Sequence, residues 1–251
     1  MKRLPLIASH LAATGFFFLA TGVSQAQDAA RAEEIRGVIR PVQEAWISSD
    51  LGMQIEKMPY KEGDKFKSGD LLISYDCSPT QAQLQAANAK TAAETVTWKN
   101  NRELRKNNAI GQYDVDLAKA RVDQAAAESK IVSAQLEKCM VRAPFDGAMS
   151  TLAARLFETP ERGAKVILIL NISKLEVEIL VPSTWLTRVA SGTKFKLDVD
   201  ETGEPVSGEI VRIAPLIESV SQTVKIVGLI KGPPEKVKPG MSGNVTFEFQ
   251  L

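Results

Sequence analysis

Two long stretches without proline or glycine lie in the middle of the chain, and they restrict its fold more than any other feature. Residues 80–108 and 112–138 are rich in Ala, Gln, Lys and Glu, which favour helices. Pro79 suits the first position of a helix, so we expect Ser78 to be the N-cap. The segment Asn107–Gly111 between the stretches is a natural turn. The sequence therefore predicts two antiparallel helices joined in a hairpin.

Small residues recur at alternating steps of three and four in both stretches, which is the spacing of a heptad seam. They are Ala82, Ala86, Ala89, Ala93 and Val96 in the first stretch, and Ala118, Val122, Ala125, Ser129, Val132 and Leu136 in the second. Small residues allow two helices to pack closely. Neither stretch has the wide apolar face of a helix folded onto a globular core. We therefore predict a projecting coiled-coil hairpin over residues 78–138.

The sequence on both sides of the hairpin predicts short strands and tight turns. Gly63-Asp64 and Gly69-Asp70 lie six residues apart and precede the apolar residues 71–73, a pattern typical of turns between strands. After the hairpin, residues 140–147 run from a strand into a turn, and residues 166–170 are wholly apolar. Further strands are expected near residues 175–181, 194–199, 208–213, 223–230 and 244–249. Such spacing favours a small antiparallel barrel at the end of the chain.

Residues 1–26 have the order of a secretory signal peptide. Lys2 and Arg3 precede an apolar run over residues 11–23, and Ser24–Ala26 offers a small-x-small cleavage site. The apolar run is shorter than the roughly 20 residues that span a bilayer, so we expect cleavage after Ala26 rather than a retained anchor. No later stretch is long and apolar enough to span a membrane. We therefore expect an exported protein.

The composition points away from catalysis. His10 is the only histidine and lies in the leader, so the mature chain cannot use a Ser-His-Asp or Cys-His site or a His-ligated zinc. Cys77 and Cys139 do not have metal-ligand spacing. The 31 Lys and Arg are matched by 30 Asp and Glu, which gives no electrostatic reason for nucleic-acid binding. We expect no enzyme activity, no metal site and no nucleic-acid partner.

The two cysteines frame the predicted hairpin. Cys77 stands just before the first helix and Cys139 just after the second, so antiparallel helices of similar length bring them together at the base. Neighbouring helix axes lie about 8–10 Å apart, which makes a Cα separation of roughly 4.4–6.8 Å attainable. An oxidising compartment favours the bond. The alternative is two buried thiols that never meet. We predict a Cys77–Cys139 disulfide.

This order of parts resembles that of the membrane fusion proteins, the HlyD-type and RND-type periplasmic adaptors. Three motifs carry the resemblance: residues 62–72 are similar to the end of the first half of the family's lipoyl-like domain, residues 141–147 to the opening of its second half, and residues 208–215 with Thr223 and Lys238–Met241 to its barrel signature. The resemblance implies an elongated multidomain protein of mixed α and β structure. Its parts would be a lipoyl-like domain (residues 35–76 plus 139–172), the hairpin (78–138) and a small antiparallel β-barrel (173–251).

The resemblance also implies a function and partners. Such adaptors link an inner-membrane transporter to an outer-membrane channel in tripartite efflux or secretion systems, as periplasmic rings that usually hold six copies. The hairpin tip would meet the channel, through Leu104, Arg105, Asn108, Ile110 and Gln112. Ile110 has a second interpretation, as a staple that holds the turn. No cofactor is expected, because a lipoate or biotin carrier would need a modifiable lysine where the hairpin stands.

The chain departs from the family pattern in several places. No strands follow the barrel, so the membrane-proximal domain is expected to be absent, and residues 158–163 keep one glycine where two glycine turns are usual. Members that dock on TolC-like channels often carry Arg, Leu and Ser at the tip, and only Leu104 matches, with Asn100 and Gly111 at the other positions. The methionines that a metal-efflux adaptor would cluster are dispersed, at positions 53, 58, 140, 149 and 241. An exported coiled-coil scaffold for a membrane protein without an export pump remains the alternative.

Overall fold

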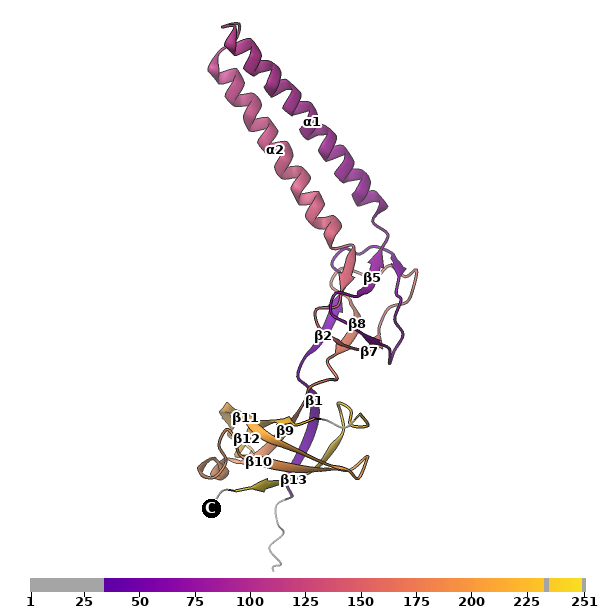
Figure 1. Ribbon diagram of the computed structural model, residues 1–251, viewed down its shortest axis with the longest axis vertical. Helices are drawn as coiled ribbons and strands as arrows, with labels where there is room; N and C mark the ends of the chain where they lie inside the picture. Colours follow the sequence, from indigo (N-terminus) through magenta and orange to yellow (C-terminus); the bar gives the residue numbers. More distant parts are fainter. Residues whose placement is uncertain (1–33, 233–234, 250–251) are drawn as a thin grey trace, which may run out of the picture. The chain divides into compact units, whose positions relative to one another are not determined.

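The computed structural model describes residues 34–232 and 235–249 of the 251-residue chain (Figure 1). The expected signal peptide at residues 1–26, with His10, lies outside the described residues. The described chain forms a lipoyl-like β-domain that is split by an antiparallel helical hairpin, and a closed β-barrel. The fold class predicted from the sequence is therefore confirmed.

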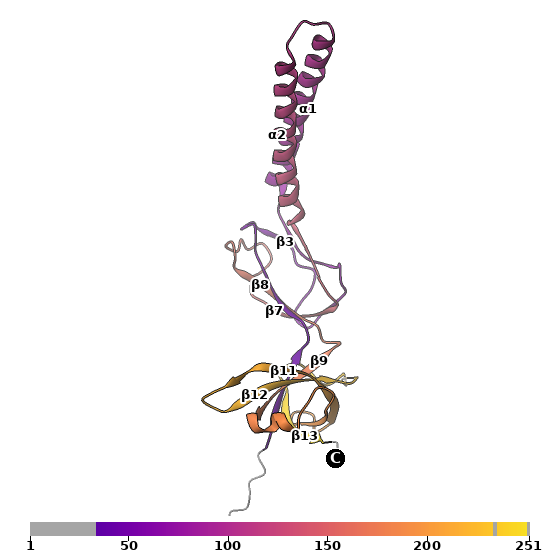
Figure 2. The same cartoon turned by 90° about the vertical axis from the view of Figure 1, so that its left-hand side faces the viewer.

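The hairpin consists of α1 (Ser78–Lys106) and α2 (Gln112–Glu137), which lie side by side in Figures 1 and 2. Ser78 lies inside α1 and is not its N-cap, which corrects the expected boundary. The cause is Asp76, whose Oδ1 accepts hydrogen bonds from the Ser78 N–H at 3.1 Å and the Ser78 hydroxyl at 2.7 Å. This carboxylate supplies the acceptor that a capping side chain usually gives to the first turn.

The packing seam of α2 is as predicted, but that of α1 is not. The predicted α1 stripe from Ala82 to Val96 is exposed. The half-buried residues of α1 are instead on the opposite side and include Leu84, Thr91 and Trp98. Lys119 of α2 places its Nζ 5.5 Å from the centre of the Trp98 ring. Leucine and tryptophan bury more apolar surface than alanine, which favours this face of α1 for the contact.

The lipoyl-like domain draws strands from both sides of the hairpin sequence. One sheet has the order β2 (Glu44–Ser48), β8 (Lys165–Leu170), β7 (Gly147–Leu152) and β4 (Lys65–Phe66), and the other has the order β3 (Ile55–Lys57), β5 (Leu71–Tyr75) and β6 (Met140–Arg142). A shared core between them includes the fully buried Ile55, Ile73, Ile167 and Ile169. The two half-motifs read from the sequence thus form one folded unit.

The two halves of this domain repeat one backbone arrangement. In each half, a turn exchanges a pair of hydrogen bonds of 2.8–2.9 Å with a strand of the other half. The bonds run from Gly63 N to Met149 O and from Met149 N to Asp64 O in one case, and from Phe157 N to Ile55 O and from Ile55 N to Glu158 O in the other. Gly63 and Phe157 therefore occupy equivalent places in an internal two-fold repeat.

The barrel closes through a strand that the sequence analysis assigned elsewhere. Its strand order is β1 (Arg36–Pro41), β13 (Ser242–Glu248), β10 (Lys194–Val199), β11 (Pro205–Glu218), β12 (Thr223–Ile230) and β9 (Leu175–Pro182), with a short 3-10 helix, Ser183–Thr187, after β9. Residues 36–41 were expected in the lipoyl-like domain, so that boundary was wrong. The physical reason is that β1 pairs with both β9 and β13, whose edges would otherwise stay open.

Glycines make room for the largest side chain in the barrel core. Phe195 of β10 is buried, and its ring lies against Gly208 of β11 and Gly228 of β12. A Cβ atom at Gly228 would lie 2.2 Å from a Phe195 ring carbon, and one at Gly208 would lie 2.5 Å away. These two positions require glycine because the ring occupies the space of a side chain.

Candidate functional site

The hairpin tip exposes most of the residues that were predicted to contact a partner. Leu104 is 45% exposed, and Arg105, Asn108 and Gln112 are also exposed, whereas Ile110 is half-buried. The partial burial of Ile110 agrees better with the staple interpretation than with docking. Arg105 donates a hydrogen bond of 3.1 Å to Asn108 Oδ1, so these two side chains form one polar surface beside Leu104.

Two apolar residues near the tip were missed by the sequence analysis. Tyr113 is 75% exposed and Leu117 is 39% exposed, both in the first turns of α2. Val115 and Ala118 of the same helix are buried. Because residues two positions apart point to different sides of a helix, the inward seam could have identified Tyr113 as an outward-facing residue.

The base of the hairpin carries the two cysteines. Cys77 and Cys139 are joined by a disulfide in the structure, with their Cα atoms 6.1 Å apart. Both side chains are buried and belong to the core of the lipoyl-like domain, where Met53 Sδ lies 3.5 Å from Cys77 Sγ. Lys138, at the end of α2, forms an ion pair of 3.0 Å with Asp50 of the lipoyl-like domain. The ends of both helices are thus attached to one core.

Each helix has a second stripe of small or apolar residues that faces away from its partner helix. On α1 it consists of the exposed Ala82, Ala86, Ala89, Ala93 and Val96, and on α2 of the exposed Leu117, Ala120, Ala127, Ile131 and Ala134. Ile131 is 61% exposed and Val96 is 57% exposed. We call these two sets the outer stripes. The hairpin therefore has an apolar strip along each of its two flanks.

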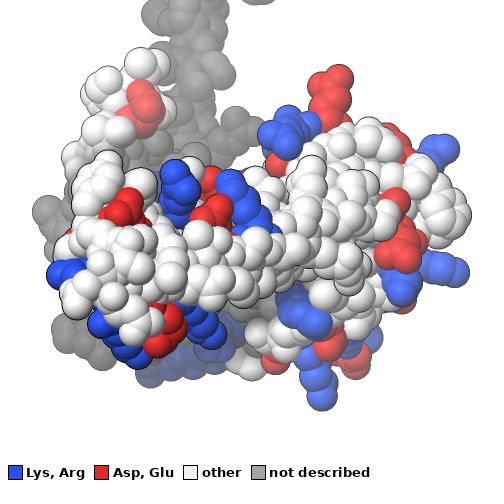
Figure 3. All heavy atoms as spheres, turned by 90° about the horizontal axis from the view of Figure 1, so that it is seen from above, with Lys and Arg blue, Asp and Glu red and all other residues white. Residues whose placement is uncertain are grey.

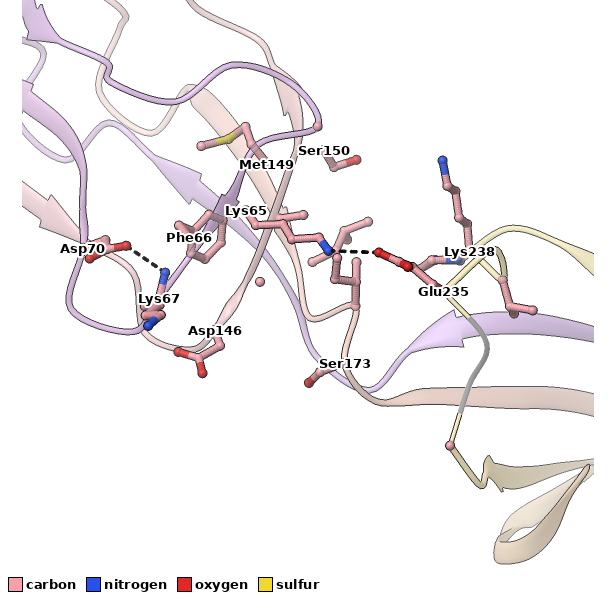
Figure 4. Close-up of a pocket in the computed structure, with 18 residues that line it drawn as sticks. Lys65, Phe66, Lys67, Asp70, Asp146, Met149, Ser150, Ser173, Glu235 and Lys238 are labelled. Carbon is pink, nitrogen blue, oxygen red and sulfur yellow. Dashed lines mark hydrogen bonds and ion pairs between the residues drawn. The ribbon is translucent and has the colours of Figure 1, made fainter. Parts of the chain in front are cut away.

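Carboxylates close both turns of the first half-motif. The Lys61 N–H donates to Asp64 Oδ2 and the Lys67 N–H donates to Asp70 Oδ2, each at 2.8 Å, and the second bond is drawn in Figure 4. The Tyr60 hydroxyl also donates to Asp70 Oδ2, at 2.9 Å. The Lys67 N–H, followed by the Tyr60 hydroxyl, lowers the pKa of Asp70, and the same bond to Asp70 raises the pKa of Tyr60. Asp70 therefore acts as an ionised acceptor that fixes the turn.

The second half-motif forms its first turn without glycine. The Arg155 N–H donates to Glu158 Oε2 at 2.8 Å, just as Lys61 donates to Asp64 in the first half. Phe157 adopts a φ of 69°, where the equivalent Gly63 has a φ of 91°. The missing glycine turn noted in the sequence is thus present in the backbone, with phenylalanine in the left-handed region.

Charged side chains are mixed rather than gathered by sign. On the face shown in Figure 3, Lys and Arg side chains alternate with Asp and Glu, with uncharged surface between them. On the barrel, Arg212 pairs with Glu176 and Lys231 with Glu209, each at 2.6 Å. The two opposite charges within each pair neutralise each other locally.

The part of the chain that the structure describes lacks both a metal-ligand cluster and a membrane-spanning helix. Within residues 34–232 and 235–249, His, Cys, Asp and Glu side chains do not gather in groups of three or more that could hold a metal ion. Over the same ranges, none of the helices is both long enough and apolar enough to cross a membrane.

The chain thus combines a β-domain that is interrupted by an antiparallel helical hairpin with a closed barrel. The structure of the membrane fusion protein Spr0693 from Streptococcus pneumoniae R6 has a TM-score of 0.74 with this chain at 18% identity, and the match covers 86% of this chain and 98% of that one. The resemblance that the sequence motifs indicated is therefore confirmed, and the chain has the fold of this family.

Curated proteins are similar to the chain over most of its length, although no family model matches it. An uncharacterized protein of Haemophilus influenzae is 27% identical over 191 residues, which cover 76% of this chain and 50% of that protein. The multidrug resistance protein MdtE of Escherichia coli K12 is 23% identical over 238 residues, which cover 83% of this chain and 62% of MdtE. The chain thus spans between half and two thirds of the length of these relatives.

Proposed function

We propose that the chain is a non-catalytic periplasmic adaptor that links an inner-membrane transporter to an outer-membrane channel. The observation that carries this proposal is the hairpin tip, where Leu104, Arg105 and Tyr113 are exposed although neither helix needs them for packing. Aromatic and arginine side chains are enriched at the centres of protein interfaces. The similarity to a multidrug resistance protein supports a role in efflux.

The hairpin is suited to hold its tip at a fixed distance from a partner. Each helix rises about 1.5 Å per residue, so the 29 residues of α1 span about 40 Å. Lys90 of α1 and Glu128 of α2 form an ion pair of 2.7 Å across the hairpin, and Asn101 donates to the Asp114 carbonyl at 3.2 Å. This ion pair and this hydrogen bond between the two helices support a hairpin that behaves as one rigid unit.

We further propose that the adaptor assembles as a ring of six copies with neighbouring hairpins side by side. The outer stripes support this arrangement, because one flank of a hairpin can pack against the other flank of the next copy. Small residues at heptad spacing allow such close approach. An interface between different flanks of identical copies generates a closed ring when the rotation between copies allows it.

The double substitution Leu104→Asp with Arg105→Glu tests the role of the tip. It replaces an apolar and a basic side chain by carboxylates, so efflux of a fluorescent dye by the native host should fall to the level of the deletion strain. The amount of adaptor should stay unchanged, because both residues are exposed. Lys99→Glu, a charge reversal at an exposed position of α1 about two turns before its last residue, Lys106, is the matched control and should retain efflux. Full efflux by the double variant at normal abundance would exclude the tip as the docking site.

A further inference from the structure

Phe157 has a backbone conformation that costs free energy, and its side chain is little buried by the rest of the chain. Its φ of 69° lies in the left-handed region, which is unfavourable for residues with a Cβ atom. Its side chain is 66% exposed, and that of the neighbouring Leu156 is 46% exposed. A phenylalanine in this position would be expected to recover the cost by burial, and here it does not.

The internal repeat shows what the turn requires. The equivalent residue in the first half is Gly63, which forms the same pair of backbone hydrogen bonds at a similar positive φ. Glycine adopts this region without steric cost. The turn can therefore be built with glycine, and phenylalanine at position 157 serves something other than the fold. Residues held in strained conformations often mark functional sites.

The strand order locates this residue at one edge of a sheet. The turn that holds Phe157 is bonded to β3, and the sheet continues as β3, β5 and β6. Within the described residues, β6 pairs only with β5, so it forms the opposite edge. Met140 lies on β6 and is 53% exposed. One edge of this sheet therefore carries the aromatic ring of Phe157, and the opposite edge carries the flexible thioether of Met140. The two side chains are complementary apolar groups.

We propose that Leu156 and Phe157 of one copy pack against Met140 on β6 of a neighbouring copy. The occupant is a second copy of this chain, because both halves of the contact are present on opposite edges of one sheet. A sulfur atom near an aromatic ring makes a favourable contact. β5 runs into α1 and β6 follows α2, so the sheet and the outer stripes belong to elements that are connected directly in the chain. This inference rests on the proposed ring. In that ring, Leu156, Phe157 and Met140 are among the residues that hold neighbouring copies together.

The substitution Phe157→Gly separates the effect of the strained turn on folding stability from the effect of the side chain on association between copies. In the isolated full chain it should raise the midpoint of thermal unfolding by about 2–4 °C, because it removes the steric cost of the left-handed backbone conformation. In sedimentation velocity it should raise the concentration needed for association about tenfold or more. Gln222→Gly is the matched control, since Gln222 also has a positive φ, 52°, but lies in the exposed turn between β11 and β12. It should stabilise the chain and leave association unchanged.

A photo-crosslink identifies the contact directly. Benzoylphenylalanine at position 157 should link to a peptide containing Met140 of a second copy when cells that make the adaptor are irradiated. A more stable Phe157→Gly variant that associates normally, or a crosslink from position 157 to another protein, would overturn the contact while the ring stands. If an amine crosslinker traps no oligomer of the wild-type adaptor in cells, the proposed ring fails, and this inference fails with it.

Discussion

Removal of the Cys77–Cys139 bond tests how the hairpin is attached to the lipoyl-like domain. We propose that the bond forms in the exported protein, since both residues are buried and their Cα atoms are 6.1 Å apart. The bond closes a loop with a sequence separation of 62 residues. On the chain-entropy model a loop of this length stabilises the folded state by about 4 kcal/mol. The variant Cys77→Ala with Cys139→Ala should lose that free energy.

Thermal unfolding followed by far-UV circular dichroism measures the loss. For a chain of this size, 1 kcal/mol corresponds to a shift of about 2–4 °C, so the midpoint should fall by about 8–16 °C. Wild-type protein in excess dithiothreitol is the matched control, because it lacks the bond but keeps both sulfur atoms, and its midpoint should fall similarly. Amide hydrogen exchange should increase most in the first turn of α1 and the last turn of α2, next to the broken link.

Two results would refute this reasoning. Alkylation of unreduced protein from the periplasm would label both cysteines if the bond does not form there. A shift of less than 2 °C in the double variant, with the bond present in the wild type, would show that the loop is already restricted in the unfolded chain.

Two further predictions concern the barrel and the turns. Gly228→Ala should destabilise the chain by about 1–3 kcal/mol in urea unfolding, because the new methyl group would overlap the Phe195 ring; an unchanged midpoint would show that the ring can move aside. The pKa of Asp70 is lowered in the folded state by the Lys67 N–H and the Tyr60 hydroxyl, so this carboxylate stabilises the fold above its ordinary pKa of 3.8 and loses that effect as the pH falls through its lowered value. Asp70→Asn should therefore lower stability at pH 7 and flatten its decline in acid, and parallel pH profiles for the two proteins would contradict this.

Local patterns in the sequence determined most of the architecture. The absence of proline and glycine between residues 80 and 138, apart from Gly111, leaves helices as the favoured structure, and the turn at Asn107–Gly111 makes them antiparallel. Gly63-Asp64 and Gly69-Asp70 predicted their turns because glycine accepts a positive φ and aspartate accepts backbone N–H bonds. These features depend on residues close together in the chain, so they can be read without the fold.

Tertiary structure decided which surfaces meet. Helix α1 carries two stripes at heptad spacing, and only packing against α2 selects the one with Leu84 and Trp98 and leaves the alanine stripe outside. Strand β1 joins the barrel because β9 and β13 need partners for their edges, although it lies far from them in the sequence. The equivalence of Phe157 and Gly63 follows from hydrogen bonds between the two halves. In each case the deciding free energy comes from contacts between distant segments, which local propensity does not contain.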